Sequence, residues 1–171
     1  MSRYLIAVFF LLGTTACDSR TGEESDGDMT AENIAVVRHQ LEEMDAGNLD
    51  VFDELCAQGY RYHAPGVPEP LTCEEHKESA REFYTAFSDF GHTVEDIVAV
   101  GDRVVVRLID FGTHTGNFAG LPATGNAVRF SVIAINRLEN GKIAETWITA
   151  DFPTLLQQLG SVPPGLLGEV P

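Results

Sequence analysis

The side chains best suited to acid–base chemistry are Asp151 and His63. Asp151 ends the stretch KIAETWITAD, which also holds the only tryptophan, Trp147. Burial beside an indole disfavours the charged carboxylate, so the pKa rises and Asp151 becomes a better base near neutral pH. Alternatively, because Asp151 stands just before Pro153, it caps the backbone N–H groups of a following helix. The residues alone support both interpretations equally.

His63 closes the pattern YRYH, directly before a proline-rich loop. An imidazole titrates near neutral pH, so His63 could shuttle a proton, while a hydrogen-bonded core histidine is the alternative. Tyr62 is a candidate for the wall of a ligand pocket. Arg107 interrupts a run of apolar residues and must pair with an acid, bind an anionic or enolate-like ligand, or face solvent. His114 stands where a strand meets its loop, at the expected pocket mouth.

Several other kinds of chemistry find no support. His92 and His114 show neither His-x-His nor His-x-x-x-His spacing, so we predict no metal site. The glycines at 112 and 116 lack the following Lys and helix of a phosphate-binding loop. No G-x-S-x-G element marks a serine nucleophile. The net charge of −15 disfavours nucleic acid as a partner.

The elements that must position these residues change from helical to alternating periodicity along the chain. Apolar residues at 34, 37, 41 and 44 predict a helix over 30–46, and a short helix over 48–55 follows. Thr72 and Glu75 form a capping-box pattern for a helix that ends near residue 88. Alternation predicts strands at 60–63, 93–100, 103–115, 127–139 and 142–151. A short helix at 153–159, closed by Gly160, follows the last strand.

This order favours an α+β fold, because helices precede an antiparallel meander whose last hairpin is marked by Asn140-Gly141. A long curved antiparallel sheet with N-terminal helices packed on it can form a cone around a pocket. In the last strand Trp147 and Asp151 share a face, which we expect to be the pocket wall. If the opposite side of the sheet faces out, a homodimer could use the apolar-rich set Val105, Ile109, Ser131, Ile133 and Ile135.

The N-terminus has the features of an export signal. A basic start and an apolar run precede small residues and Cys17, as in a bacterial lipobox, although an ordinary secretory signal cut nearby is the alternative. We expect a signal peptide at 1–16, lipidation at Cys17, an acidic flexible linker at 17–29, one domain at 30–160 and a loose tail at 161–171. The protein would then be exported and held by a lipid anchor on the membrane at the bacterial cell envelope.

Export would place Cys56 and Cys73 in an oxidising compartment, where they could form a disulfide. Two buried free thiols are the alternative.

The stretch GDRVVVRLIDFGTHTGNFAGLPATGNAVRFSVIAINRLENGKIAETWITAD, with YRYH upstream and LLQQLG downstream, resembles the SnoaL-like polyketide cyclases. It also resembles the related ester cyclase group, and both groups belong to the nuclear transport factor 2-like superfamily. The resemblance covers about residues 30–160 and implies the conical fold.

The resemblance also implies a cofactor-independent cyclase or isomerase acting on a small apolar, carbonyl-containing ligand. Asp151 would be the acid or base of an intramolecular aldol reaction, and His63 would assist. Known cyclases carry a second histidine one strand earlier, where this chain reads Ile135-Asn136-Arg137, so Arg137 would steady negative charge instead. The alternative is a non-catalytic lipoprotein that binds a small molecule.

Overall fold

The computed structural model describes the backbone of residues 20–162 and the side chains of residues 29–162. The expected signal peptide, Cys17 and most of the C-terminal tail lie outside the described residues. In chain order the elements are α1 (Arg20–Asp45), α2 (Val51–Leu55), β1 (Cys56–His63), α3 (Cys73–Ala86), β2 (Gly91–Val100), β3 (Arg103–Thr113), β4 (Ala127–Glu139), β5 (Lys142–Ala150) and α4 (Phe152–Gln158). Among the described residues, no helix is both long and apolar enough to cross a membrane.

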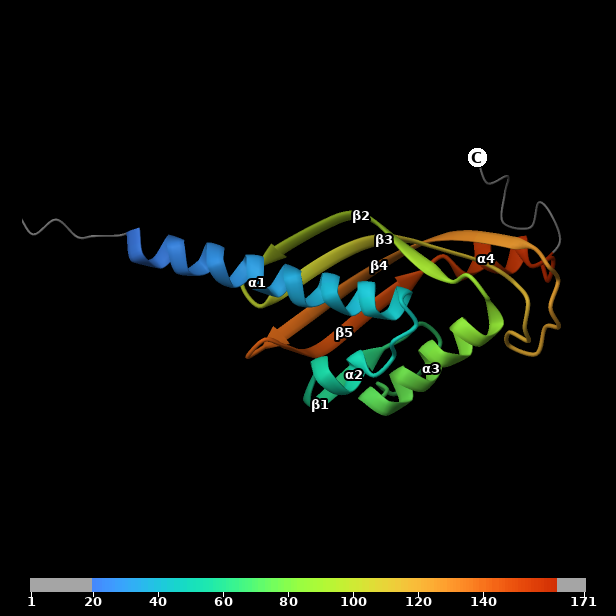
Figure 1. Cartoon of the computed structure of the whole chain (residues 1–171), viewed down its shortest axis with the longest axis horizontal. Coiled ribbons are helices and arrows are strands. Elements are labelled where there is room, and N and C mark those ends of the chain that lie inside the picture. Colours follow the sequence, from blue (N-terminus) through green and yellow to red (C-terminus); the bar gives the residue numbers. More distant parts are fainter. Residues whose placement is uncertain (1–19, 163–171) are drawn as a thin grey trace, which may run out of the picture.

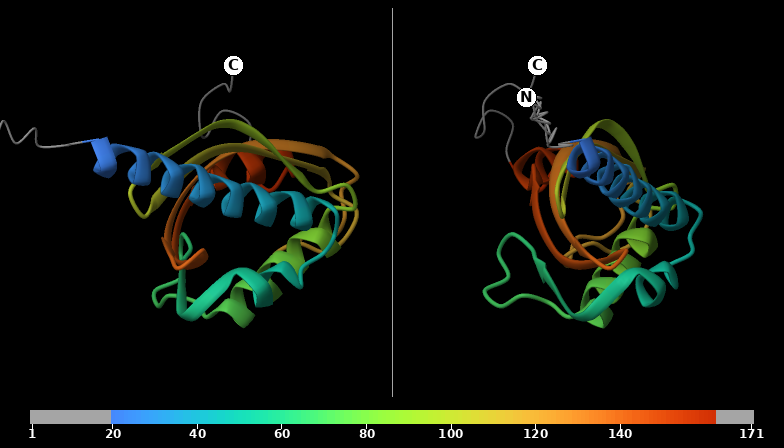
Figure 2. Two further views of the ribbon diagram at one scale, coloured as in Figure 1. Left: turned by 60° about the vertical axis from the view of Figure 1, so that its left-hand side comes forward. Right: turned by 90° about the vertical axis from the view of Figure 1, so that its left-hand side faces the viewer.

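The strands form one curved sheet in the order β1-β5-β4-β3-β2 (Figure 1). The meander from β2 to β5 is antiparallel, as its alternating pattern predicts. β1 differs, because it joins the edge of the sheet parallel to β5. The sheet curls, and α1 and α3 lie across its concave side (Figure 2). The fold is therefore the expected α+β cone.

Local sequence signals account for most element ends. Asn140 and Gly141 both have positive φ, 51° and 72°, which is the backbone of the tight turn that joins twisted antiparallel strands. Thr72 and Glu75 form the predicted capping box at the start of α3. α1 begins at Arg20, ten residues before the predicted start, and so includes most of the stretch that the sequence assigned to a flexible linker, because extending an existing helix is much easier than nucleating one.

The core lies on the concave face of the sheet. From β3, Val104, Val106 and Leu108 point inward and are at most 4% exposed. Two cross-links fix α3 beneath this face. Cys56 and Cys73 form a disulfide that joins the start of β1 to the start of α3. The ammonium of Lys77 lies 2.8 Å from carboxylate oxygens of both Asp50 and Asp53, which links α3 to the N-terminal end of α2.

Candidate functional site

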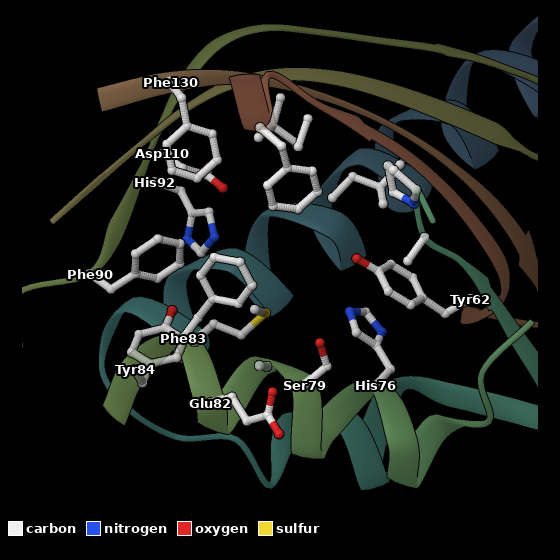
Figure 3. A pocket seen from close by; sticks show the side chains of 18 of the residues that line it. Tyr62, His76, Ser79, Glu82, Phe83, Tyr84, Phe90, His92, Asp110 and Phe130 are labelled. Atoms are coloured by element: carbon white, nitrogen blue, oxygen red, sulfur yellow. The ribbon is translucent and has the colours of Figure 1, made fainter. Parts of the chain in front are cut away.

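A cavity of about 470 Å³ lies between the concave face of the sheet and helices α1 and α3 (Figure 3). Its wall is mostly apolar and aromatic, and the described residues that line it include no Lys or Arg. Polar side chains face it at two places, one around Asp110 and one around His76. Such a cavity suits a small, largely apolar and uncharged molecule with a few fixed polar contacts.

Asp110 is the buried acid of the cavity. It follows Val104, Val106 and Leu108 on the inner face of β3 and is 7% exposed. Its Oδ1 atom is buried and accepts no hydrogen bond from any described residue. Burial raises the pKa of Asp110 to about 6; His92 opposes this shift and Asp45 adds to it. A carboxyl group with this pKa can take up or release a proton near neutral pH.

His92 lies next to Asp110. The two residues are cross-strand partners on β2 and β3, and their side chains lie together at one end of the cavity (Figure 3). Nδ1 of His92 is 2.6 Å from Oδ1 of Asp45, the last residue of α1. This contact fixes the imidazole ring, so that its other nitrogen is the one available to a ligand or to Asp110.

His76, from α3, forms the second polar group. Its Nδ1 atom is 2.8 Å from the Tyr60 hydroxyl, and its ring stacks on Tyr62 at 3.6 Å between centroids. Phe52 makes a T-shaped contact with the same ring at 4.7 Å between centroids. Burial lowers the pKa of His76 to about 3, so the ring is neutral at physiological pH. Its accessible surface faces the cavity, where it can form a hydrogen bond without carrying charge.

The predicted wall of Trp147 and Asp151 is wrong, because β5 lines the cavity with the opposite face, through Ile148 and Ala150. Asp151 lies outside the cavity lining. It is the N-cap of α4, where its carboxylate accepts hydrogen bonds from the backbone N–H and hydroxyl of Thr154 at 3.1 and 2.7 Å. The structure thus shows the capping arrangement that the sequence left open.

Three other predicted site residues gather on the outer side of the sheet around Glu145. His63 and Arg137 lie 2.9 and 3.3 Å from its carboxylate oxygens. The ring of His63 also stacks on Trp147, whose indole lies 5.5 Å from the Arg103 guanidinium. Burial opposes ionisation of Glu145, but its hydrogen bonds and neighbouring cations hold the pKa below its usual range. This cluster is separate from the cavity.

The remaining predicted site residues lie in three different places. Arg107 is exposed and pairs with Glu95 at 3.4 Å, on the outer face of the sheet. His114 is fully buried but outside the cavity lining, and its Nδ1 accepts a hydrogen bond from the backbone N–H of Thr124. Tyr62 lines the cavity, as expected. The structure therefore brings one predicted site residue to the cavity and leaves the others elsewhere.

Sequence reasoning missed the group formed by Asp45, His92 and Asp110. One signal was present, because Asp110 has the same strand parity as the buried Val104, Val106 and Leu108. No comparable signal marks Asp45, which ends an amphipathic helix in an ordinary way. Within the side chains that the structure describes, no three His, Cys, Asp or Glu residues converge as a metal site would require.

Comparison with known proteins identifies the family. A model of the SnoaL-like polyketide cyclases matches residues 35–159. The chain is 30% identical over 132 residues to aklanonic acid methyl ester cyclase DauD of Streptomyces sp. (strain C5), covering 74% of this chain and 81% of that protein. The equivalent cyclase DnrD of Streptomyces peucetius is also 30% identical, over 74% of this chain and 90% of its own length.

Solved structures agree with this assignment. IdmH of Streptomyces antibioticus superposes with a TM-score of 0.68 at 30% identity, covering 75% of this chain and 98% of IdmH. AclR of Streptomyces galilaeus has a TM-score of 0.72 over 78% of this chain and 99% of AclR, and at 24% identity it supports the fold alone. The chain belongs to the SnoaL-like polyketide cyclase family.

Proposed function

We propose that this protein is a cofactor-independent cyclase or isomerase that acts on an uncharged carbonyl compound, with Asp110 as its acid–base group. The observation that carries the proposal is the buried carboxyl of Asp110, which faces the cavity with one oxygen unpartnered among the described residues. Its pKa of about 6 lets it act as a base at neutral pH. Asp110 replaces Asp151 in the role that the sequence suggested.

The charge of the cavity wall supports an uncharged substrate. The described lining contains the acids Glu82 and Asp110 and no Lys or Arg. A free carboxylate would lose its hydration there without gaining a cationic partner, which costs much free energy. Burying an uncharged ester or ketone costs far less. The two curated relatives are named for a methyl ester substrate, which is uncharged at the corresponding carboxyl group.

The proposed reaction uses Asp110 twice. Its carboxylate removes a proton from the carbon next to a substrate carbonyl, which leaves an enolate. The neutral ring of His76 and the polar groups beside it lie in the same cavity and stabilise the enolate oxygen. The enolate carbon then attacks a second carbonyl of the same molecule, and the new alkoxide takes the proton back from the carboxyl of Asp110 or through His92. Asp45 positions His92 for this transfer.

A matched pair of carboxylate variants tests the proposal. Asp110→Asn should lower turnover of aklanonic acid methyl ester, or of another aryl keto ester that the protein accepts, by at least about 100-fold. Asp151→Asn, the control outside the cavity, should keep turnover within a few-fold. In the wild type, kcat/KM should rise with pH through about 6 as Asp110 loses its proton. Equal activity of Asp110→Asn and wild type would rule out Asp110 as the base.

A non-catalytic binding protein is the second candidate. It is favoured by the apolar cavity face of β5, where Ile148 and Ala150 offer no titratable group. In that case no variant changes turnover because there is none, and Asp110→Asn changes ligand affinity alone. Exchange of the α-hydrogens of an aryl ketone in D₂O, followed by NMR, distinguishes the two candidates. The enzyme accelerates exchange and the binder does not.

A further inference from the structure

Behind Asp110 the cavity continues into an inner chamber of about 80 Å³, enclosed by α1, β3, β4 and β5. The chamber and the main cavity share Tyr62, His76, His92 and Asp110 in their walls. The proposed reacting groups therefore stand at the junction of the two spaces. A ligand in contact with Asp110 can extend one small substituent into the inner chamber.

Two buried amide side chains line this chamber. Gln40, from α1, is 8% exposed, and Asn136, from β4, is 3% exposed. Gln40 forms no side-chain hydrogen bond with any described residue. The Asn136 amide forms one, through Oδ1, which accepts from the Thr146 hydroxyl at 2.8 Å. Gln40 and Asn136 both line the chamber, so their unpaired amide groups can form hydrogen bonds with a polar group that enters it.

The neighbouring hydrogen bonds determine what kind of partner fits. Since the Asn136 carbonyl oxygen is already used by Thr146, the Nδ2 hydrogens remain to be donated. The Tyr60 hydroxyl is paired with His76, and the Thr146 hydroxyl is paired with Asn136, so these polar groups already have partners. An anion in the chamber would meet the Asp110 carboxylate without a cation to balance it. A hydrocarbon would leave both amides unpaired.

We propose that Gln40 and Asn136 bind an uncharged carbonyl or ester oxygen of the substrate in the inner chamber. This contact positions the substrate so that the carbon beside that group passes Asp110. The claim that this orientation serves catalysis rests on the proposed function. The amide subsite itself is a binding property and can be tested without turnover. Gln40 and Asn136 are substrate-binding residues in this arrangement.

Three aryl probes of similar shape test the subsite by NMR titration: methyl benzoate, isopropylbenzene and benzoate. The wild type should bind methyl benzoate more tightly than benzoate. Gln40→Leu should weaken methyl benzoate roughly five- to tenfold, the usual effect of one lost hydrogen bond, and leave isopropylbenzene unchanged or tighter. Gln58→Leu, an exposed glutamine on β1, is the matched control and should change neither.

Asn136→Asp, which keeps an acceptor and loses the N–H donors, should weaken methyl benzoate in the same way. If this variant no longer binds isopropylbenzene, its cavity is damaged and the Gln40→Leu result decides. The subsite is disproved if Gln40→Leu weakens both neutral probes equally or neither, or if methyl benzoate does not bind the wild type up to its solubility limit. An active Asp110→Asn enzyme would instead refute the proposed function and leave the subsite intact.

Discussion

Asp110 shows how far single residues could be interpreted from the sequence. Alternation in β3 separates Val104, Val106, Leu108 and Asp110 from the residues between them, but it does not say which face is inside. A charged residue among valines is visible in the sequence. Its raised pKa is not visible there, because that depends on the fold burying the carboxyl and bringing Asp45 near it, against the opposing effect of His92.

The raised pKa of Asp110 predicts a pH-dependent loss of stability. The folded state binds this proton up to a pH of about 6, while the unfolded chain releases it near 3.8. The free energy of unfolding therefore falls as pH rises from about 4 to 6, by roughly 3 kcal/mol at most, and this contribution is constant above and below that range. Asp110→Asn cannot ionise, so it should gain on the wild type over the same range.

Urea denaturation of both proteins between pH 3.5 and 8 measures this effect. The difference between the two unfolding free energies isolates Asp110, because the other titratable groups are common to both. A difference that does not vary with pH would show that Asp110 ionises as freely in the folded state as in the unfolded chain.

At the scale of elements, periodicity and turn residues predicted the positions of the strands better than they predicted the residues of the site. The predicted bounds of β4 match, and those of β2, β3 and β5 agree within two residues, because alternation and the Asn140-Gly141 turn are local signals. The face of β5 was misassigned because both of its faces carry apolar residues. The parallel pairing of β1 with β5 rests on contacts between distant parts of the chain, which no local pattern encodes.

The disulfide anchors α3, the helix that carries His76, and should contribute to the unfolding free energy of the protein. Cys56 and Cys73 are separated by 17 positions in the sequence. Loop-closure entropy for a bond of that span corresponds to about 3 kcal/mol, so a Cys56→Ala/Cys73→Ala double variant should lose about that much unfolding free energy. Reduction with dithiothreitol should destabilise the wild type similarly and leave the double variant unaffected. Wild type that is equally stable with and without reductant would contradict this.

At the scale of the whole molecule, the convex side of the sheet carries exposed apolar and arginine side chains, although the net charge of the chain is −15. Four exposed apolar side chains lie on it, Val98, Val100, Phe111 and Ile133, between 37% and 81% exposed. Val105, Ile109 and Ile135 lie on the same face, as do Arg103, Arg107, Arg129 and Arg137. An apolar patch bordered by arginine is typical of a protein interface.

We predict that this convex face, the one on which the sequence placed a possible homodimer, pairs with the same face of a second copy. Such pairing would bury the apolar strip and keep the acidic remainder of each copy apart, which limits repulsion between two chains of like charge. Light scattering coupled to size exclusion should give a dimer for residues 30–162, and Ile133→Arg should convert it to a monomer. Val67→Arg, at an exposed apolar residue off the sheet, should leave the dimer intact. A monomeric wild type at 100 μM, or equal dissociation by both substitutions, would exclude this interface.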